Sequence, residues 1–66
     1  MKNTLKVERA VRNMTQQELA DAVGVSRQTI NSIETDRYTP STVLALKIST
    51  VFMKTVNELF QLEKGD

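Results

Sequence analysis

Apolar residues recur along the chain at helical spacing, and the clearest stripe lies beyond the middle. Between about residues 41 and 53, four apolar residues follow the spacing i, i+1, i+4 and i+8, which makes one face of a helix. They are Leu44, Ala45, Ile48 and Phe52. Further apolar residues of this segment lie outside the stripe: Val43, Leu46, Val51 and Met53. A helix so apolar around its circumference is expected to have a second neighbour.

Two shorter helices are predicted in the first third of the chain. The first spans about residues 3–12 and ends at Asn13, a residue type that tolerates a left-handed backbone. The second follows Thr15, which precedes Glu18 by three residues in a capping-box pattern. This helix stops at Gly24, and its inward residues are expected to be Leu19, Ala20 and Val23.

A third helix follows after a very short turn, because Ser26 is a suitable cap only two residues beyond Gly24. Its apolar side shows only Val25, Ile30 and Ile33, and its remaining positions before Glu34 are polar. The loop TDRYTP ends this helix, and its Pro40 is well placed at the start of the next. Thr55 and Glu58 repeat the capping-box spacing before a last short helix, VNELFQL. The fold class is therefore all-α, with five helices.

The composition excludes several classes of protein. A chain of 66 residues is expected to form one domain, residues 1–66, near the size at which a single core suffices. Cysteine and histidine are absent, which excludes disulfides, thiolate chemistry, the usual zinc sites and imidazole catalysis. No apolar run approaches the ~18 residues of a membrane span, and the charged start MKNTLKVERA is no signal peptide. We expect a cytoplasmic protein without a metal, cofactor, membrane or small-molecule partner.

Charge is distributed unevenly along the chain. Residues 1–54 hold eight Lys/Arg and five Asp/Glu, a balance of +3 within a total of +1. Residues 55–66 hold Lys64 against Glu58, Glu63 and Asp66, a balance of −2. The positive part contains the polar third helix.

The third helix carries a row of polar residues, Ser26, Arg27, Gln28, Thr29, Asn31 and Ser32, which we call the polar row. The turn before this helix suggests a role for it. A turn this tight joins two helices at roughly 90–120° and leaves the start of the second projecting from the surface. Such a helix can enter the ~12 Å major groove of DNA, where Arg pairs with guanine and Gln or Asn with adenine. Little charge is needed in the row, because phosphate contacts elsewhere supply most of the affinity.

The joined segments TQQELADAVGVSRQTINSIE, RYTPS, LALKIS and NELF resemble the helix-turn-helix family of phage repressors and Cro proteins, including its short single-domain regulators. The resemblance covers about residues 5–62. It implies a five-helix DNA-binding domain that forms a homodimer on double-stranded DNA and represses transcription. It also implies that the chain termini can form a small two-stranded piece, here KNT with QLE. Asn13 and Asp36 stand where the family often has Gly, and Met53 with Lys54 replaces its usual turn.

The resemblance also assigns residue roles. Base contacts are implied for Arg27, Gln28 and Asn31. Contacts to the DNA backbone, or secondary base contacts, are implied for Gln16, Ser26, Thr29, Ser32, Arg37 and Tyr38. A buried ion pair between Arg9 and Glu34 is implied to tie the first helix to the third.

The dimer contact is expected at the end of the chain, because an acidic segment is repelled by phosphate and should face away from DNA. The candidates are Leu59, Phe60 and Leu62, with Leu46 and Met53 as additions. Leu59 and Phe60 can instead close the monomer core.

Several of these residues have a second explanation. The polar row can be an ordinary solvated helix face, Arg9 and Glu34 can each be exposed, and Tyr38 can cover the edge of the core. Glu18 and Asp21 are a carboxylate pair, but Glu18 is better explained as a cap, so no enzyme is expected. The alternative function is an antitoxin or another protein-interaction module on the same fold.

Overall fold

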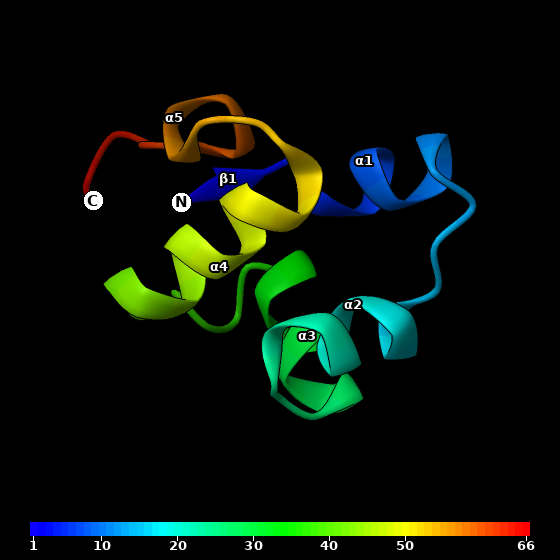
Figure 1. Ribbon diagram of the computed structural model, residues 1–66. Helices are drawn as coiled ribbons and strands as arrows, with labels where there is room; N and C mark the ends of the chain where they lie inside the picture. Colours follow the sequence, from blue (N-terminus) through cyan, green and yellow to red (C-terminus); the bar gives the residue numbers. More distant parts are fainter.

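The computed structural model describes residues 1–66 and shows the expected five helices, together with a small two-stranded antiparallel sheet (Figure 1). The helices are α1 (Leu5–Val11), α2 (Gln16–Val23), α3 (Arg27–Glu34), α4 (Thr42–Phe52) and α5 (Val56–Leu59). The strands are β1 (Lys2–Asn3) and β2 (Phe60–Gln61). No helix has the length and apolar character needed to cross a membrane.

Side-chain hydrogen bonds cap the start of four helices, three of them at the caps that the sequence predicts and the fourth at Ser41. Each cap side chain accepts a hydrogen bond from the backbone N–H three residues later, which satisfies a donor that the helix start leaves free. The four caps are Thr15, Ser26, Ser41 and Thr55. Both predicted capping boxes are confirmed, because Glu18 and Glu58 also accept from the backbone N–H of their caps.

Left-handed residues separate the helices. Gly24 ends α2 with φ 76°, and Asn13 and Asp36 adopt φ 52° and 61°. Asn and Asp thus adopt the conformation for which glycine is usual. Met53 ends α4 in the same region, with φ 55°, so a residue without a special preference for that region makes this turn.

Three predicted boundaries are wrong by a few residues. The first helix begins at Leu5 rather than Asn3, and the last ends at Leu59 rather than Leu62, because the flanking residues pair as β1 and β2. Asn3 lies opposite Phe60 in this sheet. Pro40 precedes the cap Ser41 and lies outside the first turn of α4, which begins at Thr42.

The core consists of eleven buried apolar side chains drawn from all five helices and from β2. They are Leu5, Leu19, Ala20, Val23, Ile30, Ile33, Leu44, Ile48, Phe52, Leu59 and Phe60. The predicted stripe of α4 therefore faces inward, except that its Ala45 is only partly buried. α4 contacts both α2 and α5, which supplies the second neighbour expected from its sequence.

Candidate nucleic-acid interface

The turn between α2 and α3 is held by backbone hydrogen bonds to one carbonyl. The N–H groups of Gly24 and Val25 donate to the Ala20 oxygen at 2.8 and 3.0 Å. A Cβ on Gly24 would meet no atom within 4 Å, so its φ of +76°, rather than a lack of space, favours glycine. Ala20 itself is fully buried, and α2 packs against α3. The start of α3 therefore has a defined position at one end of the molecule, away from α5 and the sheet (Figure 1).

The polar row lies on the outer side of α3. Ile30 and Ile33 are buried in the core, whereas Arg27, Gln28 and Asn31 are exposed. Among the neighbours expected beside them, Ser26 is exposed, and Thr29 and Ser32 are partly buried. α3 thus presents hydrogen-bonding groups to solvent along the side opposite its core contacts.

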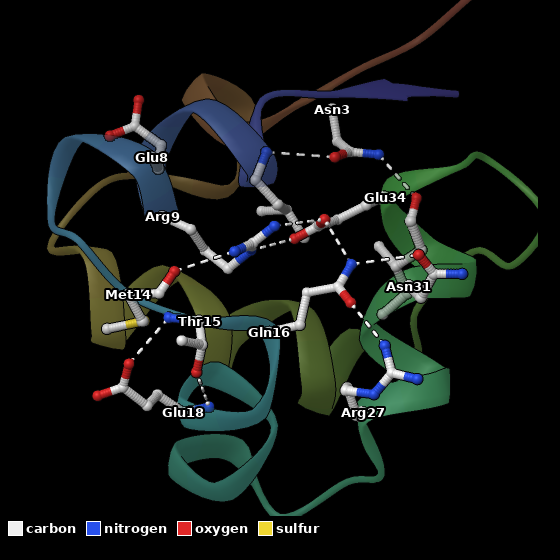
Figure 2. Close-up of polar contacts among 12 residues, drawn as sticks. Asn3, Glu8, Arg9, Met14, Thr15, Gln16, Glu18, Arg27, Asn31 and Glu34 are labelled. Atoms are coloured by element: carbon white, nitrogen blue, oxygen red, sulfur yellow. Dashed lines mark hydrogen bonds and ion pairs between the residues drawn. The ribbon is translucent and has the colours of Figure 1, made fainter.

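Gln16 links this row to the rest of the molecule (Figure 2). Its Oε1 accepts from Nη1 of Arg27 at 3.2 Å. Its Nε2 donates to Oδ1 of Asn31 at 3.2 Å and to Oε1 of Glu34 at 3.0 Å. Three residues predicted to meet DNA are therefore brought together, and the carboxylate of Glu34, whose side chain is 4% exposed, lies beside them.

Arg9 and Glu34 form a bidentate ion pair between α1 and α3. Nε of Arg9 lies 2.5 Å from Oε2 of Glu34, and Nη2 lies 2.9 Å from Oε1. The side chains are 12% and 4% exposed, so the pair is largely removed from water. Nη1 of Arg9 also donates to the carbonyl of Met14 at 2.9 Å, which ties the pair to the loop before α2.

The ion pair makes stability depend on pH. Burial raises the pKa of Glu34, but hydrogen bonds from Arg9 and Gln16, and the charges of Arg9 and Lys6, outweigh it and leave the pKa lowered. The Glu34 contribution is therefore complete above the unfolded-state pKa of about 4.3, and it is lost as pH falls through the lower folded-state pKa.

We expect Glu34→Gln to flatten the acid limb of stability against pH, measured by urea unfolding from neutral into acid solution. Glu8, Glu58 and Asp66 also have lowered pKa values, so part of the acid limb should remain in the variant. An acid limb of unchanged slope would contradict the assignment to Glu34.

An open groove runs beside α3 and reaches the start of α4. Its polar and charged lining includes Ser26, Gln28, Thr29, Ser32, Tyr38, Ser41 and Lys47. Tyr38 is 47% exposed and lines this groove, so it is not part of the core. Arg37 is exposed but lies outside the groove lining. Lys47 is the only charged residue of the lining.

Lys47 is a residue of the groove that the sequence pattern did not predict as part of the site. The available signal was that it is the only charge in α4. It lies one helical turn after Val43, which lines the same groove, so both residues mark a second side of α4.

The candidates for a dimer contact divide into two groups. Leu59 is fully buried and Phe60 is 7% exposed within the monomer, so both are corrected to residues of the core, and of the two only Phe60 also lines a surface pocket. Leu46, Met53 and Leu62 are 55%, 91% and 81% exposed. Beside Leu46 is a mainly apolar pocket, lined by Met1, Thr39, Pro40, Thr42, Ala45, Leu46, Val56 and Phe60.

The sequence profile of the helix-turn-helix family matches residues 5–59, which include α2, the turn and α3. The chain belongs to the helix-turn-helix family. As a member, it is a DNA-binding transcriptional regulator. The polar outer side of α3 is thus the exposed face of the second helix of the motif.

Relatives of this helix-turn-helix regulator match it over nearly its whole length. It is 49% identical over 66 residues to an uncharacterized HTH-type transcriptional regulator from Methanocaldococcus jannaschii, with 100% of both chains covered. It is 44% identical over 64 residues to an uncharacterized HTH-type transcriptional regulator from Bacillus subtilis, with 97% of both covered. These names describe regulators, in agreement with the prediction that the chain is not an enzyme.

Among solved structures, the restriction-modification controller protein C.AhdI from Aeromonas hydrophila is similar to this regulator. The TM-score is 0.77 and the sequence identity is 28%, with 85% of each chain covered. The similarity therefore extends well beyond α2 and α3 to most of the helical domain.

Proposed function

We propose that this single-domain chain is a homodimeric repressor that reads an inverted-repeat operator in the major groove and occludes a promoter in the cytoplasm. The observation that carries the proposal is the exposed row Arg27, Gln28 and Asn31, which follows a tight turn on a helix anchored by Ile30 and Ile33.

Roles follow from side-chain chemistry and position. Arg27, Gln28 and Asn31 contact base edges, where their donors and acceptors distinguish the base pairs. The groups that flank the row contact the phosphate backbone and set the register. They are Gln16, Ser26, Thr29, Ser32, Arg37 and Tyr38, to which the groove adds Lys47.

Arg27→Ala tests the direct readout. Selection of bound sites from random duplexes, followed by affinity measurements, should show a loss of about 1–3 kcal/mol on the preferred site and a flattened preference at one base pair. Arg37→Ala is the matched control, because an arginine that contacts only phosphate should weaken all sequences alike and reduce the salt slope by about 1. An Arg27→Ala protein with an unchanged sequence profile would contradict the base contact.

Two copies are needed for specific binding. One short helix with few phosphate contacts provides too little binding free energy to reach the dissociation constants of ~10⁻⁸–10⁻¹¹ M that are usual for specific sites. Two different sides of α4 support this proposal. Val43 and Lys47 line the groove beside α3. The apolar pocket is lined by Thr42, Ala45 and Leu46 of the same helix. A second copy seated on that pocket leaves both grooves free for DNA. Two-fold symmetry then places half-sites ~10 base pairs apart, with the reading helices ~34–36 Å apart.

A further inference from the structure

Glu34 has one more contact than a structural ion pair requires. Its Oε1 accepts from Nη2 of Arg9 at 2.9 Å and also from Nε2 of Gln16 at 3.0 Å. The Glu34 side chain is 4% exposed, so this second bond connects a buried, fixed carboxylate to the reading surface (Figure 2). Such charge-assisted bonds are shorter and stronger than those between neutral groups.

The ionised carboxylate determines which way the Gln16 carboxamide faces. A carboxylate only accepts hydrogen bonds and a guanidinium only donates them, whereas a carboxamide has one end of each kind. Nε2 of Gln16 must therefore face Glu34, and Oε1 must face Arg27. The observed bonds have this polarity, with Arg27 donating to Oε1 at 3.2 Å.

The same constraint reaches Asn31. Because Nε2 of Gln16 is a donor, Asn31 turns its acceptor Oδ1 toward it, at 3.2 Å. The amide nitrogen of Asn31 then points away from Gln16, as Figure 2 shows. In this orientation Asn31 turns its donors outward, toward the place of a base edge, while its acceptor Oδ1 faces Gln16.

We propose that Glu34 is a positioning residue for base recognition, which acts through Gln16 on Arg27 and Asn31. The inference rests on the proposed readout by α3, and it predicts which bases the row prefers. A row that offers donors favours base edges with acceptors, such as N7 and O6 of guanine or O4 of thymine. The donor and acceptor pair of adenine, which suits a free Asn, is disfavoured at the position of Asn31.

Glu34→Gln tests this relay, because the new side-chain amide can donate as well as accept a hydrogen bond. The Gln16 carboxamide is then free to flip, so that its oxygen faces residue 34. Site selection from random duplexes should show that the wild type prefers guanine or thymine to adenine opposite Asn31. In Glu34→Gln this ratio should fall at least about fivefold, since adenine gains a matching partner. All selections are made at a temperature where circular dichroism shows each protein folded.

Glu8→Gln is the matched control, because it also replaces a carboxylate that forms an ion pair with an arginine. Glu8 pairs with Arg12 at 2.8 Å and with Lys54 at 3.3 Å, and its side chain is 12% exposed. Its side chain contacts neither Gln16 nor α3 through any hydrogen bond. Glu8→Gln should lower stability and leave the base ratio unchanged.

Gln16→Met removes the link between Glu34 and the row but keeps both bonds between Arg9 and Glu34. It therefore tests the relay even if Glu34→Gln unfolds. This variant should lower the base ratio in the same way. Adding Glu34→Gln to it should change the ratio no further, although the thermal midpoint should still fall. Two independent effects on the ratio would contradict a relay through Gln16.

The free protein provides a readout that does not involve DNA. ¹⁵N relaxation of the Gln16 side-chain amide should show a restricted group in the wild type and a mobile one in Glu34→Gln. A wild type that selects sites but has a mobile Gln16 amide, or a Glu34→Gln protein with an unchanged base ratio, would overturn only this inference. A wild type that selects no site would overturn the proposed readout as well.

Discussion

Glu34→Ala is expected to lower the free energy of unfolding by about 3–5 kcal/mol, because it leaves the Arg9 guanidinium buried without its counter-ion. The Arg9 side chain is 12% exposed, and only its bond to the Met14 carbonyl would remain. Small domains lie toward the low end of the ~5–15 kcal/mol that proteins of ordinary size have. The variant should therefore lose most of its stability.

Urea and thermal unfolding at neutral pH measure the loss. Asp21→Ala is the control, since Asp21 is exposed and its side chain accepts one hydrogen bond, from Gln17 at 2.8 Å. This change should leave the midpoint nearly the same. A Glu34→Ala midpoint within a degree or two of the wild type would show that the pair contributes no more than a surface pair, about 0–1 kcal/mol.

Leu46→Glu is expected to separate the proposed dimer and remove specific DNA binding. Leu46 is 55% exposed in the monomer, so a carboxylate is tolerated there until a second copy covers it. Affinity for the preferred site should fall about 10³-fold or more, toward the ~10⁻⁴–10⁻⁶ M of non-specific binding. Electrophoretic or fluorescence titration of one operator duplex measures this change.

Sedimentation at micromolar concentration provides the second measurement. The wild type should sediment at twice the chain mass of 7.5 kDa, and Leu46→Glu at the chain mass itself. Val11→Glu is the matched control, because Val11 is 72% exposed on α1 and lines neither the groove nor the apolar pocket. A wild type that stays a monomer both free and on its preferred site would exclude the dimer and the palindromic operator.

The elements that could be predicted from the sequence are those whose decisive hydrogen bonds are local. Thr15, Ser26 and Thr55 each satisfy a backbone donor three residues later, so the pattern of residue types contains both partners. Gly24 ends α2 through its own backbone conformation. The tight turn, and with it the exposed polar row of α3, follows from these local choices.

The remaining features depend on residues distant in sequence that only the packed chain brings together. Phe60 belongs to β2 and the core because it pairs with Asn3 at the other end of the chain. A strand of two residues has too little pattern to be recognised alone. The contact between Gln16 and Glu34 joins residues 18 apart, and Lys47 of α4 lines the same groove as Ser26 and Gln28, which precede it by about twenty residues. Local sequence thus determined the helices and the exposed polar row of α3, and tertiary packing decided which side chains from other elements lie beside that row.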